Sequence, residues 1–172
     1  MSLPNFDEVM PRPEGSDIHL AVQARRAGKI KGESVARDHA DEIIVRSWSW
    51  GLSAGQALGS TQSTVRRSYQ ELSIVKGIDA ATTPLMSALA TNDELREVVL
   101  TMRKPGERQI DFFKVKLNEA RVVSVRHASD AAGATTETVG IAFRKVEVQY
   151  TPQQSGGSGG AATTFTDEVL PA

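Results

Sequence analysis

The two tryptophans of the chain, Trp48 and Trp50, lie two positions apart at the end of the apolar segment 42–50. Side chains two residues apart lie on the same face of a β-strand, so both indoles are expected to share one face with Ile44. Val45 is expected to face the opposite side. A strand with large apolar side chains on both faces needs cover on both, from a closed sheet or from a neighbouring subunit. The segment therefore predicts a β-protein that closes into a barrel or assembles with copies of itself.

Length and composition limit the classes of protein that this chain can belong to. Its 172 residues suit one domain with a packed core. The formal net charge of −1 argues against a nucleic-acid partner, which usually requires a basic excess. The absence of cysteine excludes disulfides, thiolate metal sites and a cysteine nucleophile.

The start of the chain and its hydropathy bear on localisation. The first twenty residues contain Asp7 and Glu8 and no apolar run of signal-peptide length. No stretch approaches the ~20 apolar residues of a membrane span, so no membrane insertion is expected. We expect a protein made in the cytoplasm, which would be secreted only by a route without a cleaved signal peptide.

Six further segments show the short apolar or alternating runs that are typical of β-strands. They are residues 17–22, 69–76, 98–104, 110–118, 120–127 and 136–150. One short helix is predicted at 79–90, where Thr82 or Thr83 could cap the first turn and Leu85 and Leu89 would stack. The pattern predicts a mainly β protein, an antiparallel β-barrel or sandwich with one short flanking α-helix.

The segment 136–150 changes phase along its length. Apolar residues fall at odd positions as far as Phe143 and at even positions from Val146 through Val148 to Tyr150. A change of phase reverses the apolar face, so either a β-bulge lies near 144–145 or the two halves bury opposite faces. The second half is therefore a candidate for contact with a neighbouring subunit.

Three regions of the chain are expected from these patterns. Residues 1–16 carry three prolines and are predicted to form an irregular N-terminal arm. Residues 17–152 form the predicted β-barrel domain, with a polar connection at 25–41. Residues 153–172 begin with a Gly/Ser-rich run and are predicted to be a flexible C-terminal tail.

The segment 51–68 is rich in Gly, Ser, Ala, Gln and Thr and has no convincing period. Its first residues match the G-x-S-x-G pattern of serine hydrolases, with Ser53 as the nucleophile. That pattern requires a strand-to-helix turn on a parallel sheet, and neither a following helix nor βαβ alternation is evident. We interpret the match as part of a flexible loop, with a serine hydrolase as a rival hypothesis.

Other chemical sites find little support in the sequence. His19, His39 and His127 are scattered and fit no metal-ligand spacing, so strand-surface or loop positions are expected for them. No phosphate-cradling glycine motif is present, and no cofactor or metal is predicted. The face of Trp48 and Trp50 could instead stack on sugars, which would make the chain a monomeric carbohydrate-binding module. The pattern as a whole indicates assembly and not enzymatic activity.

Several motifs together resemble the Hcp (hemolysin-coregulated protein) family, the ring-forming tube protein of bacterial type VI secretion. They are Asp17-Ile18-x-Leu20, Gly32-Glu33-Ser34, His39 leading into IIVRSWSWG at 43–51, Glu71-Leu72-Ser73 followed by Lys76, Asp79 and Leu85, and ETVGIAFRKVEVQYTP at 137–152. The resemblance spans about residues 17–152. Residues 1–16 and the tail lie outside it, and the stretch from Val22 to Gly32 is longer than in the family.

The resemblance implies a β-barrel with one flanking helix that assembles into hexameric rings. The rings would stack into a tube that is propelled by a contractile sheath behind a VgrG-type spike, with effector proteins in the lumen. Its subunit interface is expected to include Trp48, Trp50, Val146, Val148 and Tyr150.

The long loop after Trp50 is expected to reach the next ring, because a rigid strand anchors it while its tip is free. The residues expected to make that inter-ring contact are Leu52, Gln56, Leu58, Thr61 and Arg66. A phage-type tail tube protein has the same architecture and remains an alternative within this structural class.

Overall fold

The computed structural model describes residues 17–55, 59, 66–105, 109–154 and 159–169. Its strands and single helix follow the order β1 (Asp17–Ala24), β2 (Gly28–Ile30), β3 (Ile43–Ser49), β4 (Leu52–Ala54), β5 (Arg67–Tyr69), β6 (Leu72–Lys76), α1 (Thr82–Ala90), β7 (Leu95–Arg103), β8 (Asp111–Ser129), β9 (Thr135–Ala142), β10 (Lys145–Tyr150) and β11 (Thr163–Glu168). The predicted arm at 1–16 lies outside the described residues.

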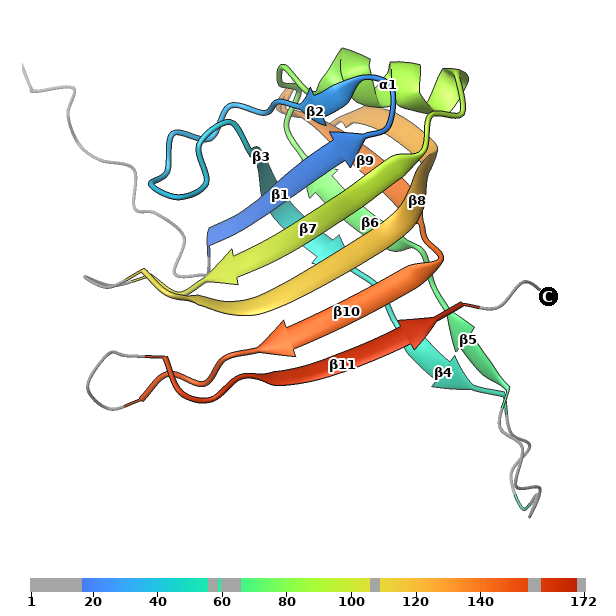
Figure 1. Ribbon diagram of the computed structural model, residues 1–172. Helices are drawn as coiled ribbons and strands as arrows, with labels where there is room; N and C mark the ends of the chain where they lie inside the picture. The colour runs from blue at the N-terminus through green and yellow to red at the C-terminus, as the bar shows by residue number, and fades with distance from the viewer. Residues whose placement is uncertain (1–16, 56–58, 60–65, 106–108, 155–158, 170–172) are drawn as a thin grey trace, which may run out of the picture.

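Six strands close into an antiparallel barrel in the order β8, β7, β1, β3, β6 and β9 (Figure 1). The 19-residue strand β8 makes the closure possible. Its first half pairs with β7 and its second half pairs with β9, so one strand joins the two ends of the sheet. The barrel fold and the short flanking helix predicted from the sequence are confirmed.

Two strand pairs lie outside the closed barrel. Strand β10 pairs with the first half of β8, and β11 pairs with β10 to form the edge of the sheet. Strands β4 and β5 form a separate hairpin that projects from the barrel near β11 (Figure 1). The flexible tail expected at 153–172 therefore contains a strand, and the loop expected at 51–68 is in part a β-hairpin.

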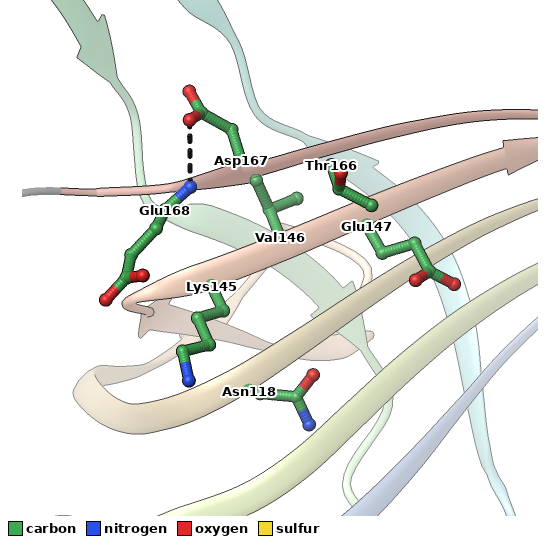
Figure 2. A pocket seen from close by; sticks show the side chains of 7 residues that line it. All are labelled: Asn118, Lys145, Val146, Glu147, Thr166, Asp167 and Glu168. Atoms are coloured by element: carbon green, nitrogen blue, oxygen red, sulfur yellow. Dashed lines mark hydrogen bonds between the residues drawn. The ribbon is translucent and has the colours of Figure 1, made fainter.

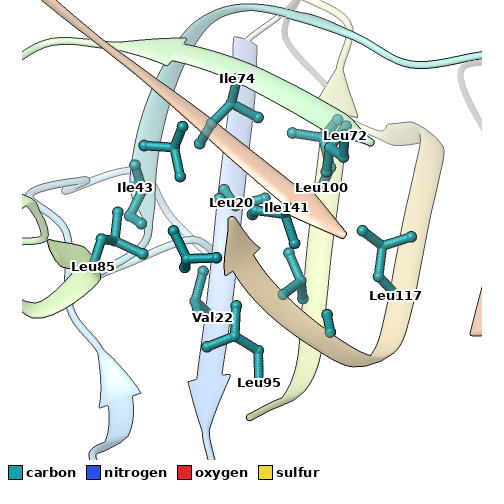
Figure 3. Close-up of a cluster of buried hydrophobic side chains, with 14 of the residues drawn as sticks. Leu20, Val22, Ile43, Leu72, Ile74, Leu85, Leu95, Leu100, Leu117 and Ile141 are labelled. Carbon is teal, nitrogen blue, oxygen red and sulfur yellow. The ribbon is translucent and has the colours of Figure 1, made fainter. Parts of the chain in front are cut away.

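The barrel interior is filled by aliphatic side chains from all six of its strands (Figure 3). Leu20, Leu100 and Leu117 are fully buried and come from three neighbouring strands. Helix α1 lies at one end of the barrel and directs Leu85 into this core, which explains why so short a helix is stable. The predicted threonine cap is absent, and the carboxylate of Asp79 accepts a hydrogen bond from the Ala81 N–H instead.

A β-bulge in β3 changes which of its side chains face the core. The pairing with β6 shifts between Val45 and Ser47, so Arg46 is the extra residue. Val45 is buried before the bulge, and Trp48 lies opposite buried Ile74 after it. The prediction that Ile44 shares a face with the tryptophans is therefore wrong, and its side chain is 52% exposed on the outer surface.

The change of phase near 144–145 marks the end of one strand and the start of another. β9 ends at Ala142 and pairs with β6 and the second half of β8, whereas β10 begins at Lys145 and pairs with the first half of β8. The single strand predicted at 136–150 is two strands, neither with a bulge at that point. In contrast, the two strands predicted at 110–118 and 120–127 are the single strand β8, in which Glu119 has a positive φ of 50°.

Candidate assembly surfaces

An aromatic cluster links the end of β3 to the hairpin and to the β9–β10 turn. The Trp50 ring stacks on Tyr69 with centroids 5.9 Å apart, and the Phe143 ring meets both of them edge-on. The ring centroids of Trp48 and of Phe113 on β8 lie 6.2 Å apart. Both indoles are partly buried against the core, so their faces already contact aromatic rings of their own chain. This arrangement disfavours the carbohydrate-binding alternative, which needs a free aromatic face.

Five residues were expected in the inter-ring contact, and the structure describes two of them, both on the β4–β5 hairpin. Leu52 lies on β4 with 47% of its side chain exposed, and Arg66 is exposed just before β5. The other three, Gln56, Leu58 and Thr61, lie outside the described residues. The hairpin therefore presents at least one large apolar side chain to solvent on a projecting element.

Ser53 lies on β4 opposite Ser68 of β5. A hydrolase nucleophile sits at a sharp turn between a strand and a helix, and Ser53 is instead in the middle of an antiparallel strand. The serine hydrolase hypothesis is therefore not supported by the local backbone.

A polar contact ties the hairpin to strand β11. Arg67 Nη2 donates to Asp167 Oδ1 at 2.9 Å, and the Tyr69 hydroxyl donates to the other carboxylate oxygen. Burial of the Tyr69 ring, together with its bond to Asp167, raises the pKa of Tyr69 to about 12. The hydrogen bond from the Tyr69 hydroxyl is the largest influence on Asp167 and lowers the pKa of its carboxyl. The bond from the Arg67 guanidinium acts in the same direction, and together they outweigh burial, which would raise that pKa. These contacts join residues that are 100 and 98 positions apart in the sequence.

A shallow pocket lies on the outer sheet formed by β8, β10 and β11 (Figure 2). Its lining is mainly polar and consists of Asn118, Lys145, Val146, Glu147, Thr166, Asp167 and Glu168. Lys145 Nζ lies 2.9 Å from Glu119, and this contact raises the pKa of the lysine. Two of the three carboxylates that line the pocket are already paired, Asp167 with Arg67 and Glu168 with Arg144.

The five residues expected at the subunit interface differ in their accessibility. Val146 is 3% exposed and packs in the core, whereas Tyr150 is 45% exposed at the end of β10. Val148, Trp48 and Trp50 are partly buried against the core. Burial of Val146 within its own chain leaves it little surface for a neighbour. The structure describes a single protomer, so the interface assignment stays a prediction.

An ion pair inside the barrel is one of the features that sequence reasoning missed. Lys76 and Glu137 are both fully buried, and Lys76 Nζ lies 2.9 Å from Glu137 Oε1. Burial alone would raise the pKa of Glu137, but Lys76 and then His127 outweigh it and lower that pKa. Lys76 also contacts the Asp79 carboxylate at 2.6 Å, which ties the start of α1 to the barrel.

Strand alternation contained the signal for this pair. Lys76 follows Leu72 and Ile74 at inward positions of β6, and the same spacing puts Glu137 on the inward side of β9 with Val139. A lysine and a glutamate at such positions predict a buried ion pair if the two strands are neighbours.

His39 lies in a loop, one of the two positions expected for the histidines, but it is buried, and His19 is buried on a strand and not on its surface. His19 lies on β1 and His39 precedes β3, and their rings stack with centroids 4.7 Å apart. In the described part of the chain, no group of three or more histidine, cysteine or acidic residues has a geometry that could hold a metal ion.

Comparisons with known proteins place this fold in a family. The family described as "Type VI secretion system effector, Hcp" matches residues 22–150. The protein hcp1 of Pseudomonas aeruginosa is 36% identical over 137 residues, which cover 77% of this chain and 85% of that protein.

Two solved structures show the same fold. Hcp1 from Salmonella typhimurium is 26% identical, with a TM-score of 0.72 over 90% of this chain and 95% of that chain. Hcp1 from the E. coli EAEC 042 pathovar is 20% identical, with a TM-score of 0.74 over 89% of this chain and 99% of that chain.

The closed antiparallel barrel and the family match together define a structural component of a secretion apparatus. The chain belongs to the Hcp family, the secreted tube proteins of the type VI secretion system. Proteins of this family are structural and not enzymes, which agrees with the interpretation of the sequence. The helix in the described residues is too short to cross a membrane.

Proposed function

We propose that this chain forms hexameric rings that stack head to tail into the inner tube of a type VI secretion system. The observation that carries the proposal is the set of large apolar side chains left exposed on one protomer. They are Val35, Ile44, Leu52, Ile78, Met86, Leu89, Val123, Tyr150 and Phe165. Most of them belong to different elements, among them β3, β4, α1, β8, β10 and β11, so apolar side chains are available for both the lateral and the axial neighbours of a ring.

The lateral contact within a ring is proposed to involve the outer sheet. Tyr150 of β10 and Phe165 of β11 are both exposed there, and β11 is the last strand in the order of the sheet. A cyclic ring needs a heterologous interface, in which one patch meets a different patch of the next copy. Within the expected set of Trp48, Trp50, Val146, Val148 and Tyr150, the exposed tyrosine is the residue most accessible to a neighbour.

The axial contact between rings is proposed to use the β4–β5 hairpin. Leu52 and Arg66 are exposed on it, and Gln56, Leu58 and Thr61 complete the proposed contact. The contact of Arg67 and Tyr69 with Asp167 fastens the base of the hairpin to β11.

The partners follow from the same proposal. A VgrG-type spike would lie at the tip of the tube, a contractile sheath would surround it, and effector proteins would travel in the lumen. The protein would be made in the cytoplasm and leave the cell through the apparatus without a cleaved signal peptide. No cofactor and no nucleic acid are required in this role.

Electron microscopy and native mass spectrometry of the purified full-length chain test the ring. We expect uniform annuli and a mass of six chains at micromolar concentration. Tyr150→Asp should place a charge in the proposed lateral contact and shift the mass toward single chains. Ala131→Asp, in the exposed β8–β9 turn, adds the same charge elsewhere and should leave the rings intact. A wild-type protein that remains a single chain would contradict the proposal.

A further inference from the structure

The ring of His39 contacts a carboxylate through each of its nitrogens. Nδ1 lies 2.8 Å from Glu42 Oε2, and Nε2 lies 3.0 Å from Asp111 Oδ1 on β8. An ionised carboxylate can only accept hydrogen bonds, so the charged form of His39, in which both ring nitrogens donate, is the form that fits both contacts. Burial lowers the pKa of His39, but its bonds to Asp111 and Glu42 outweigh burial and raise the pKa above its usual value.

The ring of His19 covers one face of this imidazolium. The two rings are nearly parallel, at 5°, and both are buried. Nδ1 of His19 is buried and has no hydrogen-bond partner among the described residues. Burial, followed by the neighbouring His39 and Arg103 charges, lowers the pKa of His19. A neutral ring on a charged one is therefore the stable arrangement.

Other charged groups surround the pair from each packed element. Asp17 lies on β1, Arg103 on β7, and Lys114 on β8 next to the Asp111 carboxylate. Arg103 is buried, and its guanidinium contacts Asp17 and donates to the carbonyl of Arg37. On the segment itself, Asp38 and Asp41 are exposed and Lys31 pairs with Asp41 at 3.6 Å.

These contacts dock the segment 31–42 against the end of the barrel. Within the segment, the Ser34 N–H donates to Glu42 O and the Asp41 N–H donates to Ser34 O. Its described contacts with the rest of the barrel include the His39 bond to Asp111 and the Arg103 bond to the segment backbone. The docked segment holds Val35 at the surface with 96% of its side chain exposed.

We propose that residues 31–42 form a proton-operated latch, which is docked on the barrel while His39 is charged and His19 is neutral, and released when pH leaves that range. The latch would set the position of Val35 on the protein surface according to pH. This inference concerns one protomer and does not depend on the proposed ring.

The sign of the pH dependence differs for the two histidines. Because docking raises the pKa of His39, protonation of His39 stabilises the docked state. This stabilisation is complete below pH 6.5, the pKa in the released state, and it is lost as pH rises through the pKa of the docked state. The lowered pKa of His19 means that docking weakens as pH falls below 6.5, because only the released state takes up that proton. Docking should therefore be strongest near 6.5 and weaken on both sides.

Hydrogen exchange of the full-length protein across pH tests the latch, after correction for the intrinsic exchange rate. We expect protection of the Ser34 and Asp41 amides to fall about tenfold on the alkaline side for each unit by which docking raises the His39 pKa. Amides of β8 serve as the internal reference and should not follow this profile. Native mass spectrometry of the same samples separates latch release from dissociation of the ring.

Three variants assign the two limbs of the profile. His19→Phe keeps a stacked ring without the titration, so the acid-side loss should disappear while the alkaline side remains. Asp111→Asn should weaken docking near 6.5 and flatten the alkaline side. Glu97→Gln neutralises an exposed carboxylate on β7 outside the cluster and should change neither limb. Equal corrected exchange of both amides from acid to alkaline pH in the wild type would overturn the proposal, as would an unchanged acid limb in His19→Phe.

Discussion

The closed barrel and the two strand pairs outside it, β4–β5 and β10–β11, are held in place by different forces. The barrel encloses aliphatic side chains and the fully buried pair of Lys76 and Glu137. The outer strands bury few apolar side chains and are joined to each other by Arg67, Tyr69 and Asp167. The difference indicates that the stability of the protomer lies in the barrel, and that the outer strands are available for contacts with neighbours. Substitutions in the two regions should therefore separate folding from assembly.

The largest effect is expected inside the barrel, at the buried ion pair. Lys76→Met removes the cation that compensates Glu137 and should lower the free energy of unfolding by about 3–5 kcal/mol, because it leaves a buried carboxylate without its main partner. The double variant Lys76→Met/Glu137→Leu should recover most of that loss. Chemical denaturation measures both. A double variant as unstable as the single one would contradict the explanation by an unpaired charge.

The same pair predicts how the barrel responds to acid. The lowered pKa of Glu137 contributes stability above its unfolded value of 4.5, and this stability is lost as pH falls through the lower folded value. The slope of unfolding free energy against pH in that acid range should be shallower in the double variant than in the wild type. Equal slopes would show that other carboxylates account for the acid sensitivity.

The aliphatic core should show the next largest effect. Leu100→Ala removes a fully buried side chain between β1 and β8 and should cost about 2–5 kcal/mol of unfolding free energy. Leu52→Ala removes the same group from the exposed hairpin and should cost less than about 0.5 kcal/mol. Comparable losses in the two variants would erase the distinction between the barrel and the outer strands.

The link between the outer strands should have a small effect on stability and a clear spectroscopic effect. Asp167→Asn removes the carboxylate that accepts the Tyr69 hydroxyl, so the pKa of Tyr69 should fall from about 12 towards 10.0. Unfolding free energy should change by less than about 1 kcal/mol because the contact is near the surface. Absorbance titration in a Tyr150→Phe background follows Tyr69 alone, since the chain has two tyrosines. An unchanged pKa would mean that burial alone sets it.

The parts of the fold that the sequence predicted are those that depend on local alternation. Leu72 and Ile74 are buried on the strand that was predicted within 69–76, and Leu85 is buried on the helix that was predicted at 79–90. The reversal near 144–145 is also real, because the chain leaves one strand and enters another there. These features are visible in a short window because each follows the period of a single element.

The features that sequence reasoning missed depend on partners distant in the chain. The bulge at Arg46 exists only because β3 pairs with β6 in a particular register. Strand β11 is polar and forms only against β10, so its own sequence gave little sign of it. The stacking of His19 on His39 joins β1 to the segment before β3, and no spacing rule predicts it.

The smallest effect on folding, and the most informative for assembly, is expected at Leu52 on strand β4 of the hairpin. Leu52→Asp should change the unfolding free energy by less than about 0.5 kcal/mol, because the side chain is exposed. It should leave the rings intact but shorten the stacks seen by electron microscopy, since it puts a charge into the proposed axial contact.

Ser53→Asp provides the matched control for that charge. Ser53 is also exposed on β4, but its side chain lies on the opposite face of the strand from Leu52. Stacking that is lost only in Leu52→Asp would identify the contacting face of the hairpin, and loss in both would implicate the whole hairpin. Broken rings in Leu52→Asp would instead place the hairpin between neighbours of the same ring, because a defect limited to the axial contact leaves the closed ring untouched.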